Sequence, residues 1–265
     1  MTWKWEELTA PDFAAAVEKT RGVCIIPCGV IEKHGAHLPL GTDSINGTAL
    51  AVAAAELEPA VVFPFYYFGM IQTAKPQPGT ISYSTRLLLD ILEESCAEAA
   101  RNGLHKVVLL DSHGGNQHLL GLFMRMLQEK PRDFTAYLIT LGAAGVGQPE
   151  VVRDLMTTAY DHHGGEIETS FTLHNRPDLV RMELTAECSG ADQKRLAHLG
   201  PVVTSVDWYA RFPEHYAGDA TRASKEKGAT YAERLARRVA ALLKAIKEDR
   251  VTPGILEEFH AKTRH

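Results

Sequence analysis

The sequence predicts an α/β fold: a single compact domain with a mainly parallel sheet flanked by helices on both faces. Short apolar runs rich in β-branched residues alternate with segments of helical periodicity, the pattern of strand–helix–strand units. The 265 residues are 45% hydrophobic, which is enough for one substantial core. No repeat, low-complexity tract or linker divides the chain, so we expect one domain over residues 1–265.

The first half of the chain contains four predicted elements in alternating order. Gly22–Gly29 is a continuous apolar run, which indicates a buried strand, and the Ala-rich segment Ile45–Leu57 indicates a helix after it. Val61–Phe68 is a second apolar run and is predicted to be a strand. Thr85–Asn102 is predicted to be a helix because its apolar residues recur at helical spacing, and Gly103 is a typical helix stop.

The second half continues the alternation. Lys106–Leu110 is the third predicted strand, and Gln117–Gln128 is the helix after it. Phe134–Leu141 is the fourth predicted strand. Tyr231–Lys247 is a strongly amphipathic helix near the end. Because parallel sheets need cover on both faces, we expect helices on both sides of these strands.

Composition and charge exclude several classes of protein. The formal net charge is -5, the pI is about 6.2 and no basic stripe is visible, so no nucleic-acid partner is expected. No apolar run reaches the roughly 20 residues of a membrane-spanning helix. Four scattered cysteines do not suggest a disulfide framework, and the first residues lack the apolar core of a signal peptide. We expect a cytoplasmic protein that acts on a small molecule and has no membrane partner.

The segment after the first predicted strand concentrates side chains that bind metals. It reads Glu32-Lys-His34-Gly-Ala-His37-Leu-Pro-Leu-Gly-Thr-Asp43. Residues two apart in an extended segment point the same way, so Glu32 and His34 can face one point, and a loop can return Asp43 to it. Carboxylates and imidazoles are ligands that suit zinc, iron or manganese.

A second group of such residues follows the third predicted strand, in the stretch Asp111-Ser-His113-Gly-Gly-Asn116. Sites in open α/β sheets lie beyond the carboxyl ends of the strands. His113 is therefore expected at the same edge of the sheet as Glu32 and His34. The sequence thus predicts a first set of metal ligands: Glu32, His34, Asp43 and His113.

The predicted ligands suggest hydrolysis by a pair of metal ions. The two oxygens of Asp43 can bridge two ions, which together activate one hydroxide. The second ion needs another carboxylate, and the candidate is Glu168, in the first turn of a helix expected after Gly164 and Gly165. We hypothesise that metal-bound hydroxide attacks a carbonyl carbon. His163, or Glu168 if it is not a ligand, then protonates the leaving group.

Four further side chains are candidates for contact with substrate. Gln72 and Lys75 lie in a polar loop after the second predicted strand, which either reaches over the site or is a solvated surface loop. His37 either lines the pocket or orients a metal ligand by hydrogen bonding. Asn116 either caps the following helix or donates a hydrogen bond to substrate. Isolated histidines such as His215 are expected to be surface or hydrogen-bonded residues.

These motifs resemble the creatininase family of metal-dependent amidohydrolases. Four more stretches share the resemblance: Pro78-Gly-Thr-Ile-Ser82, His163-Gly-Gly-Glu-Ile-Glu-Thr-Ser170, Arg176-Pro-Asp-Leu-Val180 and Ala223-Ser-Lys-Glu-Lys-Gly228. The resemblance implies a compact creatininase-like fold and a homo-oligomer, often a hexamer. It also implies a binuclear site for zinc and/or manganese, with iron in some members.

The resemblance also implies a role for each matching residue. Glu32 and His113 would bind the first ion, His34 would bind the second, and Asp43 would bridge the two. His163 matches the family histidine that passes a proton to the leaving nitrogen.

The chain departs from the creatinine-processing members at three positions. Those members have a tyrosine and a metal-binding glutamate directly after the histidine that matches His113, and this chain has Gly114 and Gly115 there. They also have a tryptophan where this chain has Ala159. The resemblance therefore implies a substrate other than creatinine, with Glu168 supplying the missing carboxylate.

Three functions are consistent with these residues. The first is hydrolysis of a carbon–nitrogen bond in a cyclic or linear amide. The second is hydrolytic carbon–carbon cleavage of a cyclic polyol diketone of the 3-dehydro-inosose kind, which hydroxyl-binding groups in the loop from Gln72 to Gln77 would favour. The third is a non-catalytic, metal-stabilised assembly protein, since closed metal sites are structural.

Overall fold

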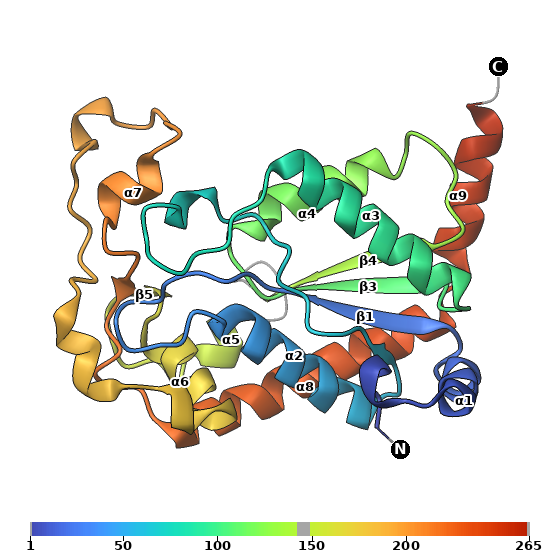
Figure 1. Cartoon of the computed structure of the whole chain (residues 1–265), viewed down its shortest axis with the longest axis horizontal. Coiled ribbons are helices and arrows are strands. Elements are labelled where there is room, and N and C mark those ends of the chain that lie inside the picture. The colour runs from blue at the N-terminus through green and yellow to red at the C-terminus, as the bar shows by residue number, and fades with distance from the viewer. Residues whose placement is uncertain (1, 142–148, 264–265) are drawn as a thin grey trace.

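Four parallel strands form the central sheet of the computed structural model, which describes residues 2–141 and 149–263 (Figure 1). Their order across the sheet is β2-β1-β3-β4. The strands are β1 (Val23–Cys28), β2 (Val61–Val62), β3 (Lys106–Asp111) and β4 (Thr135–Thr140). Strands β1 and β3 pair along their whole length and finish with Cys28 beside Asp111. The segments after these two strands therefore leave the sheet at the same level.

Helices cover both faces of this sheet (Figure 1). Helices α2 (Thr42–Leu57) and α8 (Lys225–Glu248) pack together on one face. Helices α3 (Thr85–Arg101) and α4 (Asn116–Met126) lie on the other, and α6 (Glu166–Asn175) packs against α8. A short antiparallel pair, β5 (Asp161–His163) and β6 (Ala217–Gly218), lies beyond the main sheet. The other α-helices of the described residues are α1 (Ala10–Thr20), α5 (Pro149–Val152), α7 (Asp207–Arg211) and α9 (Val251–Lys262).

The predicted α/β class, with a parallel sheet and helices on both faces, is confirmed. Strand β1 is buried along its whole length, as its continuous apolar sequence predicts, and its two cysteines, Cys24 and Cys28, are buried free thiols. No helix in the described part of the chain is long and apolar enough to cross a membrane.

One predicted strand is much shorter than expected. The run Val61–Phe68 pairs with β1 only at Val61–Val62. Pro64 follows closely and has no amide hydrogen to give to the ladder, so the chain leaves the sheet there. The aromatic residues that follow stack on one another instead, with the rings of Tyr67 and Phe68 4.4 Å apart. The prediction of a strand to Phe68 was wrong for this reason.

The helix that carries Glu168 is held by close packing against α8. A Cβ atom added at Gly228 of α8 would lie 1.8 Å from the carbonyl oxygen of Ser170 on α6, so only glycine allows this approach. The Ser170 hydroxyl also accepts a hydrogen bond from the backbone amide of Ser224 at 3.0 Å. Position 228 therefore helps to fix α6 in place.

Replacing Gly228 with alanine is expected to destabilise the fold by about 3 kcal/mol, because α6 or α8 must move away. Urea unfolding followed by circular dichroism measures this. The matched control is Gly254→Ala on α9, where an added Cβ meets nothing within 4 Å. The control should be neutral or up to about 1 kcal/mol more stable. Equal stability of the two variants would contradict the packing argument.

Candidate metal centre

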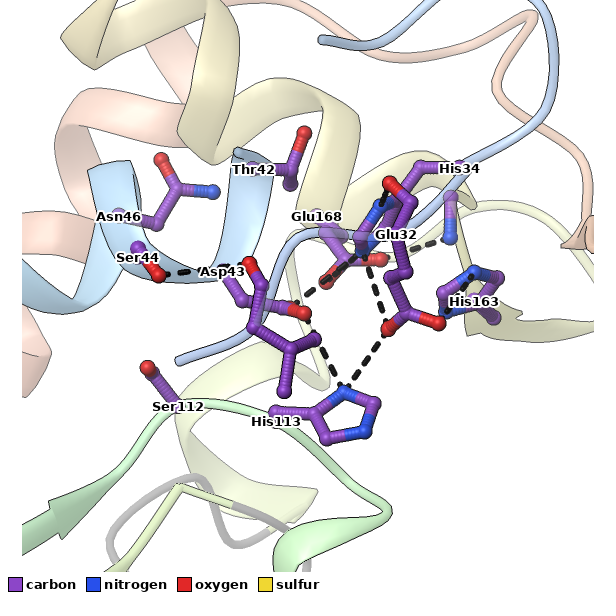
Figure 2. A network of polar contacts seen from close by, with 12 residues as sticks. Glu32, His34, Thr42, Asp43, Ser44, Asn46, Ser112, His113, His163 and Glu168 are labelled. Atoms are coloured by element: carbon purple, nitrogen blue, oxygen red, sulfur yellow. Dashed lines mark hydrogen bonds and ion pairs between the residues drawn. The ribbon is translucent and has the colours of Figure 1, made fainter. Parts of the chain in front are cut away.

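Five acidic and histidine side chains meet just beyond the ends of β1 and β3 (Figure 2). Glu32 and His34 follow β1, and His113 follows β3, so the matched ends of these strands bring them together. Asp43 and Glu168 lie in the first turns of α2 and α6, where the helix dipole favours a carboxylate. The structure thus places all five predicted ligands in one cluster.

The five side chains divide into two groups that share Asp43, and a third possible group, Glu32, His34 and His163, overlaps both. In the first group, His113 Nδ1 lies 2.8 Å from Glu32 Oε1 and 3.2 Å from Asp43 Oδ2. In the second, His34 Nε2 lies 3.4 Å from Asp43 Oδ1 and 3.5 Å from Glu168 Oε1. The candidate ligand atoms of each group lie within 4.8 Å of one another. Asp43 therefore turns one oxygen toward each group.

Backbone carbonyls fix which nitrogen of each histidine faces the cluster. His34 Nδ1 lies 3.3 Å from the carbonyl oxygen of Glu32, and His113 Nε2 lies 3.2 Å from that of Met70. A carbonyl oxygen only accepts, so these nitrogens are the donors. His34 Nε2 and His113 Nδ1 remain for the cluster. Hydrogen bonding of the far nitrogen to a carbonyl is the usual support of a metal-binding histidine.

Several buried polar atoms of the cluster have no hydrogen-bond partner, and they indicate which kind of ligand the site fits. Glu32 Oε1, His34 Nε2 and Asp43 Oδ2 are buried and have no hydrogen-bond partner among the described residues. His113 Nδ1 is close to Glu32 Oε1, but the two atoms are not in hydrogen-bonding geometry. Burying such atoms unpaired is costly, and cations would satisfy all of them. This donor set of oxygen and nitrogen fits divalent metal ions.

Glu168 is held at the open side of the cluster. The amide of Gly164 donates to Glu168 Oε2 at 2.6 Å, which leaves Oε1 facing His34. Gly164 has φ +67°, a left-handed conformation that favours glycine. The Glu168 side chain is 29% exposed, whereas that of His34 is fully buried. Solvent therefore reaches the cluster beside Glu168.

The carboxylates change the proton affinity of both central histidines. Burial lowers the pKa of His34, but Glu168 and Asp43 outweigh it and hold that pKa well above 6.5. Burial likewise lowers the pKa of His113, and Glu32 and Asp43 raise it well above 6.5. The raised pKa values favour the protonated rings in the metal-free protein, and any metal ion that binds here would displace those protons.

The metal-free protein is expected to lose stability as the pH rises above about 6.5, the reference value for histidine. A pKa raised in the folded state stabilises fully below the unfolded value, and this contribution disappears as pH rises through the folded value. Stabilisation by added zinc should instead grow over the same range. Thermal melts from pH 6 to 9, with chelator and with zinc, test both trends. A zinc effect that is flat with pH would contradict the displacement of protons.

His163 and His37 lie beside the cluster in different settings. The His163 ring stacks on His34 with centroids 4.2 Å apart, and its Nε2 donates to the carbonyl oxygen of Lys33 at 2.9 Å. Burial and then the charge of His34 lower the pKa of His163.

His37 is buried, and its Nε2 lies 2.9 Å from the Thr169 hydroxyl on α6. His37 therefore contacts the helix of Glu168, but its hydrogen bond is to Thr169 and not to a predicted ligand.

The other three residues predicted to contact substrate, Asn116, Gln72 and Lys75, differ in burial and in hydrogen bonding. Asn116 is fully buried and links two segments, since its amide nitrogen donates to Cys28 O and its oxygen accepts from the amide of Met70. It does not cap α4, which has Gly115 at that position, so the capping alternative was wrong. The amide nitrogen of Gln72 donates to the carbonyl oxygen of Tyr83, and Lys75 is exposed.

Sequence reasoning missed the position of His215 beside the cluster. This residue is buried, and its Nε2 lies 2.5 Å from Glu32 Oε2, the carboxylate oxygen that faces away from His113. Pro213 and Glu214 precede it in an irregular stretch without strand or helix periodicity. No local pattern marked it, because only the three-dimensional fold brings it back to Glu32.

The two glycines after His113 differ in their surroundings. A Cβ atom at Gly115 would lie 2.5 Å from His113 Nε2 and 3.0 Å from Met70 O, so a side chain there would disturb the hydrogen bond that orients His113. A Cβ atom at Gly114 would meet nothing within 4 Å. In this backbone, position 115 has no room for a side chain.

Comparison with curated proteins identifies relatives across most of the chain. It is 30% identical over 210 residues to the mycofactocin precursor peptide peptidase of Mycolicibacterium smegmatis, covering 77% of each chain. It is 29% identical over 191 residues to the creatinine amidohydrolase of Pseudomonas putida, covering 67% of this chain and 73% of the relative. It is 24% identical over 249 residues to the 3-dehydro-scyllo-inosose hydrolase of Thermotoga maritima, covering 84% and 77%.

Solved structures and a family description agree with these relatives. A structure named "Creatininase Mn" superposes with a TM-score of 0.79 at 26% identity, covering 94% of this chain and all of that one. A mutant creatininase of "Zn-Zn type" gives 0.78 at 25% identity, with the same coverage. Residues 6–243 match the creatininase family, described as creatinine amidohydrolase. The shared fold and a match over most of its length show that this chain belongs to the creatininase family of hydrolases.

Proposed function

We propose that this chain is a binuclear metal-dependent amidohydrolase that cleaves a carbon–nitrogen bond in a small molecule. The observation that carries the proposal is the placement of the Asp43 carboxylate, whose two oxygens face two separate groups of candidate ligands. Glu32 and His113 would hold one divalent ion with Asp43, and His34 and Glu168 would hold the other. Two such ions would supply Lewis-acid activation of water and of a substrate carbonyl.

The protein's own side chains would orient the reactants and move protons. His163 Nε2 donates to Lys33 O, which leaves Nδ1 as the ring atom that can take up and release a proton. Its lowered pKa favours the neutral ring, so it can accept a proton and then pass it to the leaving nitrogen. Glu168 is engaged by Gly164 and His34, which supports a ligand role for it over acid–base catalysis.

Two of the three relatives described above support an amide substrate. The names of these two, a creatinine amidohydrolase and a peptide peptidase, both denote cleavage of amide bonds. Creatinine itself is disfavoured, because Gly114, Gly115 and Ala159 stand where creatinine-processing members have two aromatic residues and a ligand. A cyclic or linear amide of another shape is the proposed substrate class.

A substrate panel on metal-reconstituted protein tests the proposal. The panel contains creatinine, formamides, lactams, short peptides and cyclic polyol ketones, and the assay measures released amine or ammonia. We expect amine release from at least one amide and none from creatinine. Inertness toward every amide, with two ions bound, would contradict the assignment.

Hydrolytic carbon–carbon cleavage of a cyclic polyol diketone is the second candidate. The similarity to 3-dehydro-scyllo-inosose hydrolase over 84% of the chain favours it. The polar loop gives it less support, because the amide groups of Gln72 and Gln77 already donate to the carbonyl oxygens of Tyr83 and Pro213. Turnover of a cyclic polyol ketone without release of amine would establish this alternative.

The proposals for the metal and for the assembly state rest on membership of the creatininase family. Zinc or manganese is the proposed metal, since solved creatininase structures are named for both, and iron is the next choice. We propose a cytoplasmic homo-oligomer, of which a hexamer is the family's common form. Elemental analysis of the purified protein and light scattering test these two points, and a monomer by scattering would contradict the second.

Replacing His163 with alanine is expected to lower kcat by about 100- to 10,000-fold, the usual contribution of general acid–base catalysis. Metal content should stay at the wild-type level, because the ring bonds to Lys33 O rather than to a ligand. The matched control is His162→Ala, an exposed histidine one position earlier. Loss of an ion in the His163 variant would instead identify His163 as a metal ligand.

A further inference from the structure

We propose that His215 and Trp208 are positioning residues that hold Glu32 in the orientation needed for metal binding. The proposal rests on the binuclear site proposed above. It assigns a role to two residues from the segment between 188 and 216, which leaves the body of the protein and returns to it at the cluster. Figure 1 shows this segment, which includes α7, extending from the main α/β body.

The three residues form a chain of hydrogen bonds with a defined direction. The indole N–H of Trp208 donates to His215 Nδ1 at 3.3 Å. Because indole nitrogen only donates, His215 Nδ1 carries no proton, and the ring proton sits on Nε2. His215 Nε2 then donates to Glu32 Oε2 at 2.5 Å. Trp208 thus fixes the tautomer of His215 that holds Glu32.

This chain determines which oxygen of Glu32 faces the first group of ligands. Glu32 Oε2 is engaged by His215, whereas Oε1 is buried without a hydrogen-bond partner beside His113. A carboxylate tied at one oxygen loses less conformational entropy when the other oxygen binds a metal ion. His215 therefore acts through Glu32 on the ion shared by Glu32, Asp43 and His113.

The backbone of His215 is also fixed beside the cluster. Its carbonyl oxygen accepts a hydrogen bond from the amide of Gly35 at 3.0 Å, next to His34. Its φ is 54°, in the left-handed region that asparagine and histidine tolerate better than most other residues. A substitution at this position thus affects both the side-chain bond and the backbone, and a test must separate the two.

The pair His215→Asn and His215→Gln makes this separation. Asparagine suits the left-handed backbone, but its amide ends near the position of Nδ1 and does not reach Glu32. Glutamine places an amide nitrogen near the position of Nε2 and can still donate to Glu32. Titration calorimetry of the metal-free proteins with zinc measures the two binding steps. We expect His215→Asn to weaken the step of the first group by about 10- to 100-fold and His215→Gln to recover part of this loss.

A purely structural role would give the opposite order, because asparagine fits the backbone better than glutamine. His198→Ala, an exposed histidine of the same segment, is the control and should bind zinc as the wild type does. Trp208→Phe keeps an aromatic ring and loses the N–H. Trp208→Phe should weaken the same binding step by a smaller factor. If His215→Asn does not fold, Trp208→Phe takes its place in the experiment.

Unchanged zinc affinity in His215→Asn, or weaker binding by His215→Gln than by His215→Asn, would overturn the inference. Unchanged affinity in Trp208→Phe would do the same for the role of Trp208. These outcomes differ from failure of the proposed function. If the wild-type protein binds no zinc, the binuclear site itself is overturned, whereas two binding steps of equal affinity in the wild type and in His215→Asn overturn only the positioning role.

Discussion

An Asp43→Ala variant is expected to lose both metal ions and to lower kcat/KM by about a thousandfold or more, as removal of one member of a cooperating site does. Asp43 is the one residue common to the two groups of ligands in the cluster, with Oδ1 facing His34 and Oδ2 facing His113. Without it, each group retains one carboxylate and one imidazole. A pair of ligands binds a divalent ion much more weakly than three.

Elemental analysis after gel filtration measures the metal content of this variant. The matched control is Asp111→Asn, a change at another buried aspartate next to the cluster. Asp111 Oδ1 accepts a hydrogen bond from the backbone amide of His113 at 3.2 Å, and an asparagine oxygen can accept the same bond. The control should keep two ions. Full occupancy in Asp43→Ala would reject a bridging role for this carboxylate.

The cluster was largely predictable because its residues are tied to regular structure. Glu32 and His34 follow a strand that the apolar run made visible, and His113 follows another. Parallel strands that pair in register deliver such residues to one edge, whatever the surrounding loops do. A different pattern, two glycines before the start of a helix, placed Glu168 in the first turn of α6.

The parts that sequence reasoning missed depend on contacts between distant segments. His215 is 183 positions from Glu32, and an irregular segment that no periodicity describes brings it back. The strand predicted to reach Phe68 ends before Pro64, because proline has no amide hydrogen for the ladder although the residues after it favour a strand. Asn116 resembled a helix cap in sequence, but its side chain bonds to the Cys28 carbonyl and the Met70 amide instead.

Replacing Glu168 with glutamine is expected to leave one tightly bound ion instead of two and to lower kcat/KM by more than about 100-fold, beyond the usual effect of changing a residue that only supports a ligand. Glu168 Oε1 faces His34 in the second group, and the other carboxylate near that ring, Glu32, already belongs to the first group with His113. Gly115 cannot take over, because a side chain there would collide with His113.

Glu166→Gln provides the matched control on the same helix. The Glu166 carboxylate accepts hydrogen bonds from the amides and hydroxyls of Thr157 and Thr158 and pairs with Lys227, away from the cluster. This variant should lose about 2 kcal/mol of stability, because a buried charged hydrogen bond is weakened, and it should keep both ions. If Glu168→Gln also keeps two ions and loses only turnover, Glu168 is an acid–base group. The second ion would then be held by the alternative set of Glu32, His34 and His163, whose candidate ligand atoms also lie within 4.8 Å of one another.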